Sequence, residues 1–147
     1  FPIEPSLVEM TERALEVVKH NPAGFFLLVE GSRIDRAGHS NSAEEMIGDL
    51  LMFDQAVGVA LEFAESNPGT LVVVTADHET GGFGITSGLP SGEVVNYGWL
   101  STGHTGAMVP IYAFGPGAEH FTGTLQITDI PVRIGKLMGI ENFPSTK

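Results

Sequence analysis

Three groups of acidic and histidine residues lie along this 147-residue chain. Their members are Glu30, Asp35 and His39, then the pair Asp77-His78, and then His104 inside the run Gly103-His104-Thr105-Gly106. Carboxylate and imidazole are the side chains that bind zinc, and carboxylates also bind magnesium. Each group follows an apolar run or lies in a glycine-rich loop, a layout typical of metal-assisted phosphoryl transfer.

The spacing within the groups indicates which side chains can share an ion. Asp35 and His39 are four residues apart, so one helical turn or a tight loop can direct both at one metal, with His104 as a third ligand. Asp77 and His78 are adjacent, and neighbours in a regular strand point to opposite faces. They can converge only where the backbone leaves the strand. Taken singly, an Asp-x-x-x-His pair is more often a surface pair, and Gly-His-Thr-Gly is more often a turn.

Two buried strands and one helix must position these groups. The apolar runs Phe25–Val29 and Leu71–Thr75 predict strands, and residues 42–66 carry the apolar stripe of a long helix. A strand, a helix and a second strand form a βαβ unit with parallel strands. Because Glu30 and Asp77 each follow such a strand, both are expected at the same edge of the sheet, where ligands bind in open α/β folds.

The remaining elements complete an α/β domain. Ser6 and Glu9 form the capping-box pattern of a first helix that ends near Asn21-Pro22. A hairpin or a longer excursion is expected over 83–97, a third strand over 109–114, and a closing helix over 129–138, ended by Gly139. The sequence contains no internal repeat and no low-complexity linker.

Composition excludes several classes of protein. The formal net charge is −11, from 7 basic and 18 acidic residues, so a nucleic-acid partner is not expected. The absence of cysteine excludes disulfides and thiolate zinc sites. No apolar run reaches 18 residues, so no membrane span is predicted. The chain begins with Phe1, which favours a piece cut from a longer parent.

The ordered motifs resemble those of one known family. They are Phe25-Phe-Leu-Leu-Val-Glu-Gly-Ser-Arg-Ile-Asp35 with His39, Thr70-Leu-Val-Val-Val-Thr-Ala-Asp-His-Glu-Thr-Gly-Gly82, Gly103-His-Thr-Gly106 and Val109-Pro-Ile-Tyr-Ala-Phe-Gly-Pro-Gly-Ala118. Together they closely resemble the C-terminal part of bacterial alkaline phosphatases, from about Pro5 to Gly139. The resemblance implies an α/β sandwich with a mostly parallel central sheet flanked by helices, of which residues 1–147 form a single C-terminal portion.

The resemblance also implies a role for each matching residue. Asp35, His39 and His104 match the ligands of a first zinc, and Asp77 and His78 match two ligands of a second zinc. Glu30 matches the magnesium carboxylate, and Arg36 a position that influences phosphate through water. The implied protein is a homodimeric, periplasmic or secreted enzyme that hydrolyses phosphate monoesters, releases inorganic phosphate, and works through a phosphoserine intermediate with two zinc ions and one magnesium ion.

The family's nucleophilic serine has no match in this sequence. Its phosphate-binding arginine, the aspartate that bridges zinc and magnesium, and the hydroxyl ligand of magnesium are also unmatched. No catalytic nucleophile is therefore assigned, and the isolated chain is expected to have little or no activity. Two alternatives stay open: a hydrolase of the related phosphodiesterase and sulfatase group, or a metal-binding fragment without turnover.

Overall fold

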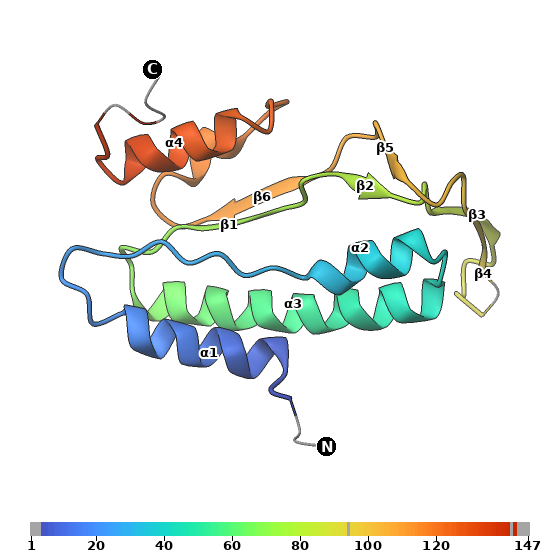
Figure 1. Ribbon diagram of the computed structural model, residues 1–147, viewed down its shortest axis with the longest axis horizontal. Helices are drawn as coiled ribbons and strands as arrows, with labels where there is room; N and C mark the ends of the chain where they lie inside the picture. Colours follow the sequence, from blue (N-terminus) through green and yellow to red (C-terminus); the bar gives the residue numbers. More distant parts are fainter. Residues whose placement is uncertain (1–3, 94, 142, 144–147) are drawn as a thin grey trace.

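The computed structural model describes residues 4–93, 95–141 and 143. Three helices form its base (Figure 1): α1 (Leu7–Val18), α2 (Ser32–His39) and α3 (Ala43–Ser66). Both α1 and α2 pack against α3. The last helix, α4 (Asp129–Leu137), follows the 3-10 turn Ala118–Phe121. None of the helices in the described residues combines the length and apolar character needed to cross a membrane.

Local sequence signals set the helix boundaries as predicted. The Ser6 hydroxyl accepts a hydrogen bond from the Glu9 backbone, and the Glu9 carboxylate accepts one from the Ser6 backbone, which completes the capping box of α1. Helix α3 begins directly after Ser42 and ends at Ser66, and α4 ends before Gly139, whose φ is +68°. These three predicted helices are confirmed.

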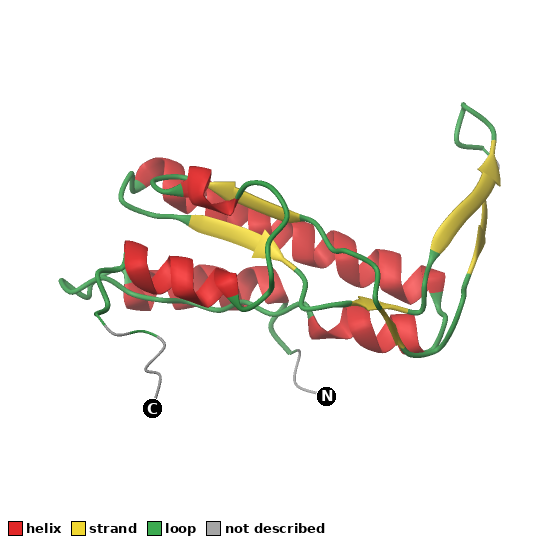
Figure 2. Ribbon diagram, turned by 90° about the horizontal axis from the view of Figure 1, so that it is seen from above, coloured by secondary structure: helices red, strands yellow, loops and turns green. Residues whose placement is uncertain are grey.

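The strands form three separate pairs, all antiparallel. The bounds of the strands are β1 (Val72–Thr75), β2 (Glu79–Thr80), β3 (Gly84–Gly88), β4 (Val95–Gly98), β5 (His104–Thr105) and β6 (Ile111–Phe114). Strand β1 pairs with β6, β2 with β5, and β3 with β4. Figure 2 shows the β3–β4 hairpin projecting away from the helices. The predicted hairpin and the predicted strands near 71–75 and 109–114 are confirmed.

The predicted strand Phe25–Val29 is wrong as a hydrogen-bonded strand. These residues form an extended segment that runs beside α3 into α2 (Figure 1), and none belongs to a strand pair. Consequently the described residues contain no parallel pair, and the expected parallel central sheet is not confirmed. Exposure still alternates as in a strand, because Phe25, Leu27 and Val29 are half-buried while Phe26 and Leu28 are exposed.

An apolar cavity lies between the extended segment and its neighbours. The cavity has a volume of about 160 Å³, and side chains of the 25–29 segment, α1, α3 and β1 line it. The extended segment and β1 therefore face the same apolar space without forming a ladder between them. Apolar run length predicted the extended backbone correctly, but it contains no information about the hydrogen-bonding partner.

The buried core lies where helices meet. The apolar side chains that are buried among the described residues are Leu15, Ala37, Ala43, Ala56, Ala64 and Phe121. Four of these six are alanines, so close helix approach supplies most of the burial. Large apolar side chains on the strands are more open, and Tyr112 of β6 is 65% exposed. The β1–β6 pair thus has an exposed apolar face.

Candidate metal centre

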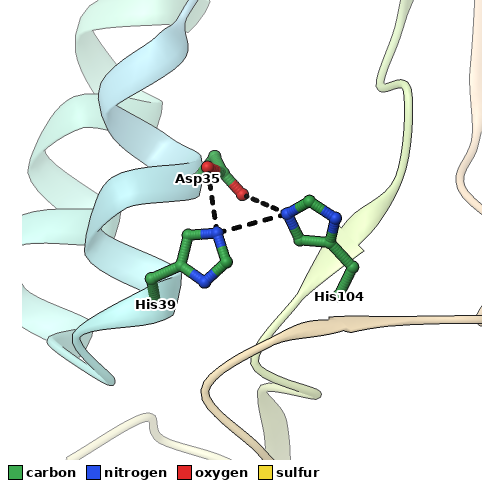
Figure 3. A group of neighbouring side chains, drawn as sticks. All are labelled: Asp35, His39 and His104. Atoms are coloured by element: carbon green, nitrogen blue, oxygen red, sulfur yellow. Dashed lines mark hydrogen bonds and ion pairs between the residues drawn. The ribbon is translucent and has the colours of Figure 1, made fainter.

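Two segments far apart in the sequence bring three potential metal ligands together. Asp35 and His39 lie one turn apart on α2, and His104 begins β5 (Figure 3). The Nε2 atoms of His39 and His104 are 3.2 Å apart. The Asp35 carboxylate lies 3.3 Å from His39 Nε2 and 3.4 Å from His104 Nε2. The residues therefore converge as the sequence predicted.

The 3.2 Å between the two Nε2 atoms matches the size of a zinc ion, and Asp35 places a different oxygen near each histidine, Oδ2 near His39 and Oδ1 near His104. Zinc bonds of about 2.0–2.1 Å at tetrahedral angles place neighbouring ligand atoms about 3.3 Å apart. The ligand type also fits, because two imidazoles and one carboxylate, with a fourth position left open, are a known catalytic zinc set. In the described part of the chain, this is the one group of three or more such residues whose ligand atoms lie within 4.8 Å of one another.

A backbone contact orients His39 toward this centre. Its Nδ1 lies 2.6 Å from the carbonyl oxygen of Thr102. A carbonyl oxygen can only accept, so Nδ1 carries the proton and Nε2 presents its lone pair to Asp35 and His104. A hydrogen bond at the second ring nitrogen is the usual way in which proteins orient a metal-binding histidine.

The carboxylate of Asp35 is held by Thr80. The Thr80 hydroxyl donates to Asp35 Oδ1 across 2.5 Å. This hydrogen bond is the largest cause that lowers the pKa of Asp35 from its ordinary value of 3.8, and the nearby histidines lower it further. Burial, the second-largest cause, acts in the opposite direction and raises the pKa, but the net shift is downward. Asp35 is therefore ionised at neutral pH, the state needed for metal binding.

The short β2–β5 pair fixes His104 opposite α2. Thr80 pairs with His104, and Glu79 pairs with Thr105. The Glu79 carboxylate accepts hydrogen bonds from the Thr105 hydroxyl and from the Gly82 backbone at 2.8 Å. Glu79 thus ties the loop that carries His104 to the turn that follows β2.

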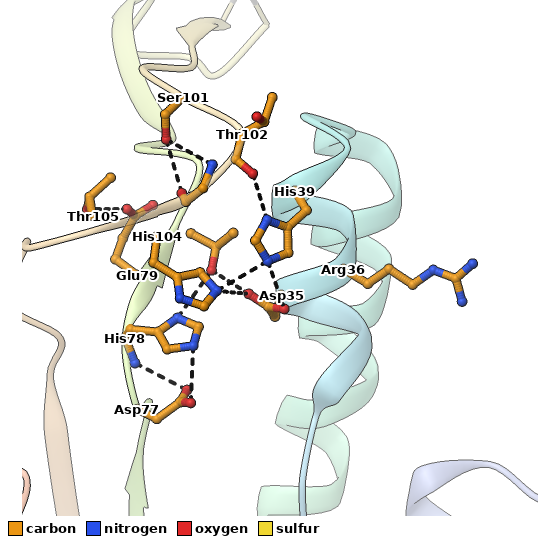
Figure 4. A network of polar contacts seen from close by, with 12 residues as sticks. Asp35, Arg36, His39, Asp77, His78, Glu79, Ser101, Thr102, His104 and Thr105 are labelled. Carbon is orange, nitrogen blue, oxygen red and sulfur yellow. Dashed lines mark hydrogen bonds and ion pairs between the residues drawn. The ribbon is translucent and has the colours of Figure 1, made fainter.

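The Asp77-His78 pair lies beside this centre, beyond the end of β1 (Figure 4). Asp77 Oδ2 is 3.1 Å from His78 Nε2, so these neighbours do converge, because they lie outside the regular strand. The His78 ring stacks on the His104 ring with centroids 3.5 Å apart. The two groups of ligands are therefore in direct contact.

Two further candidate residues are not brought into the centre. Glu30 is exposed at the end of the extended segment, and no hydrogen bond or ion pair joins it to another described residue. Arg36 is exposed on α2, and its guanidinium points away from the cluster in Figure 4.

Sequence reasoning did not assign a role to Thr80, which helps to organise the centre. A usable signal was present for Thr80: it lies two residues after His78, and alternate residues of an extended chain share a face. The contribution of Thr102 could not be found in this way, since it uses a backbone carbonyl.

Comparisons with known proteins show which family the chain belongs to. The family model for alkaline phosphatase matches residues 2–97. Alkaline phosphatase H of Pseudomonas aeruginosa is 37% identical over 94% of this chain. The alkaline phosphatase of the Antarctic bacterium TAB5 superposes with a TM-score of 0.83 at 36% identity over 90% of this chain. A variant of that enzyme, with Mg bound in its M3 site, gives a TM-score of 0.84 at 34% identity and the same coverage.

The chain belongs to the alkaline phosphatase family, and its fold is the corresponding α/β fold. The resemblance inferred from the motifs is therefore confirmed. The chain spans 32% of the length of the Pseudomonas protein, and 40% of the TAB5 chain. Less than half of these relatives is thus represented in this sequence.

Proposed function

We propose that this chain is the zinc-binding C-terminal portion of a phosphomonoesterase. Asp35, His39 and His104 hold the first zinc. The observation that carries the proposal is the convergence of one ligand atom from each residue to within 4.8 Å, with the two histidine Nε2 atoms 3.2 Å apart, a spacing that suits a tetrahedral ion. Family membership supports phosphate-ester hydrolysis over other zinc chemistry.

Asp77 and His78 supply two ligands of a second zinc. Their acceptor atoms lie 3.1 Å apart, next to the first group, as a two-metal site requires. Glu30 supplies a magnesium ligand at the end of the extended segment. These two sites need further ligands, which we assign to the part of the parent enzyme that is not in this sequence.

Zinc bound at such a centre supplies positive charge that stabilises developing negative charge on phosphate-ester oxygens. The residues of this chain hold and orient the ligands. Thr102 keeps the proton of His39 on Nδ1, Thr80 holds the Asp35 carboxylate directed inward, and Glu79 keeps the His104 loop in place. Arg36 acts on the phosphate through water, which requires its side chain to turn toward the site.

No serine of this chain is proposed as nucleophile. The hydroxyls of Ser40 and Ser101, the serines nearest in sequence to His39 and His104, donate to the backbone carbonyls of Arg36 and Gly103. We assign the phosphoserine step to the parent enzyme, together with its homodimeric state and its periplasmic or secreted location.

A chimera tests the proposed function. This chain replaces the matching 40% of the TAB5 enzyme, with Asp35→Asn in the same chimera as control. We expect hydrolysis of a phosphate monoester, weaker hydrolysis of a diester, and loss of both in the control. A folded, zinc-loaded chimera without monoesterase activity would overturn the proposal, and a preference for the diester would favour the phosphodiesterase alternative.

The isolated chain provides the complementary test. We expect it to bind zinc and to turn over a phosphate monoester more slowly than about 1 s⁻¹, the lower end of typical enzyme rates. Faster turnover by purified chain would show that it contains a nucleophile of its own.

A further inference from the structure

Thr80 lies where the two groups of ligands meet. It ends β2, pairs with His104 across the β2–β5 ladder, and its hydroxyl contacts Asp35 on one side and His78 on the other (Figure 4). No other side chain in the described part of the chain hydrogen-bonds to both groups. One hydroxyl is therefore placed to act on both ion sites.

The direction of the two hydrogen bonds follows from the single proton of a hydroxyl. The ionised carboxylate of Asp35 can only accept, so the Thr80 proton is used at 2.5 Å from Asp35 Oδ1. The Thr80 oxygen, 3.3 Å from His78 Nδ1, must then accept from that nitrogen. His78 consequently carries its proton on Nδ1.

This tautomer leaves a lone pair on His78 Nε2. That atom lies 3.1 Å from Asp77 Oδ2, which is also an acceptor. Two acceptors at this distance repel unless a cation or a proton lies between them. Thr80 thus prepares the Asp77-His78 pair for a cation in the way that Thr102 prepares His39.

The shape around Thr80 favours a residue of its size. A Cβ placed on Gly38 of α2 would lie only 3.0 Å from the Thr80 Cβ and Cγ2 atoms. The helix backbone therefore packs on the Thr80 methyl group. Valine retains this packing and removes the hydroxyl, whereas serine retains the hydroxyl and removes the methyl group.

Building on the proposed function, we infer that Thr80 is a positioning residue that couples the two zinc sites. Its hydroxyl fixes the Asp35 carboxylate of the first site and the His78 tautomer of the second. It touches the ligands and does not itself bind metal.

The first test needs no metal. In the metal-free 147-residue chain, ¹⁵N NMR of the histidine side chains distinguishes the two tautomers of His78. We expect His78 Nδ1 to carry a proton in the original chain and in Thr80→Ser, whether or not a second proton lies between Nε2 and Asp77, and a shift toward the Nε2–H form in Thr80→Val. An Nε2–H form in the original chain, or no change in Thr80→Val, would overturn the inference.

The second test measures zinc affinity by competition with a chromophoric chelator. Outer-shell substitutions typically weaken metal binding about 10–100-fold, and we expect a loss of this size at the first site in Thr80→Val. Thr80→Ser should stay within about threefold of the original chain, since it keeps the hydroxyl. Equal affinity of the valine variant would contradict the inference.

The two tests separate this inference from the proposed function. Absence of zinc binding by the original chain would contradict the proposed zinc site, while the metal-free tautomer would still decide the role of Thr80. If zinc affinity is unchanged in Thr80→Val, the proposed zinc site still stands, but the inference that Thr80 couples the two sites is rejected.

Discussion

The centre around α2 and β5 and the extended segment before α2 differ in how many contacts hold their residues in place. At the centre, each polar ligand has a partner: Asp35 has Thr80, His39 has Thr102, and the His104 loop has Glu79. In the segment, Leu28 is 77% exposed and the backbone of residues 25–29 belongs to no strand pair. The side chains around Asp35, His39 and His104 are therefore held by contacts within this chain, whereas the extended segment that leads to Glu30 has no strand partner among the described residues.

The largest expected effect is a loss of zinc affinity when a ligand of the centre around α2 and β5 is replaced. His39→Ala should weaken binding of the tightest zinc more than about 100-fold, because even outer-shell substitutions cost about 10–100-fold. Isothermal titration of the metal-free chain with zinc measures this. His20→Ala is the matched control, since His20 is exposed near the end of α1. Zinc affinity that is the same in both variants would reject His39 as a ligand.

A glycine close to the centre tests how rigidly the His104 loop is held. Gly81 has a φ of +85°, and an added Cβ would lie 2.6 Å from the Trp99 ring. Gly81→Ala should therefore lower the free energy of unfolding by about 1–3 kcal/mol and weaken zinc binding too.

Gly48→Ala is the control for Gly81→Ala, because its added Cβ meets no atom within 4 Å. In a helix interior, alanine is favoured over glycine by about 0.5–1 kcal/mol, so this control should be slightly stabilising. Urea denaturation measures both variants. A neutral Gly81→Ala would mean that the loop adapts easily.

Two neighbouring leucines test the alternating exposure of the extended segment, residues 25–29. Both line the apolar cavity, but Leu27 is half-buried, so Leu27→Thr should destabilise the fold by about 1–3 kcal/mol. Leu28 is exposed, so Leu28→Thr should change stability by less than about 0.5 kcal/mol and should reduce self-association.

Denaturation and analytical ultracentrifugation give the two readouts for these leucine variants. Equal destabilisation by both substitutions would contradict the alternating, strand-like exposure of the segment. Unchanged self-association in Leu28→Thr would place the association surface elsewhere.

The smallest effect concerns the cap of α1, far from both regions. The Ser6 backbone hydrogen bond, followed by the Ser6 hydroxyl, lowers the pKa of Glu9 from its ordinary value of 4.5. The folded state therefore favours the ionised form, and this stabilisation is present above about pH 4.5 and is lost as pH falls through the lowered pKa.

NMR titration of Glu9 in the original chain and in Ser6→Ala measures this effect. The substitution should return the pKa toward its ordinary value and cost about 1 kcal/mol, as typical for loss of an N-cap. An unchanged pKa would mean that the capping box does not persist in solution.

The elements that were predicted correctly depend on local chemistry. Ser6 and Glu9 mark the start of α1, and Gly139 marks the end of α4, through contacts within a few residues. The Asp35 and His39 spacing likewise requires only one helical turn. Signals of this kind are present in any short window of the sequence.

The elements that were missed depend on distant partners. The run Phe25–Val29 is extended as predicted, but whether it joins a sheet depends on which strand lies beside it. The role of Thr80 depends on α2, 45 residues earlier in the chain. Family resemblance supplied the metal assignments, while the contacts that orient those ligands required coordinates.

The most direct test of the central claim is X-ray absorption at the zinc edge of the chain loaded with one equivalent of zinc. We expect two imidazole nitrogens and additional oxygen ligands at about 2.0–2.1 Å, and loss of one imidazole in His104→Ala. Zinc coordinated only by oxygen, or the same spectrum in the variant, would contradict a site made by Asp35, His39 and His104.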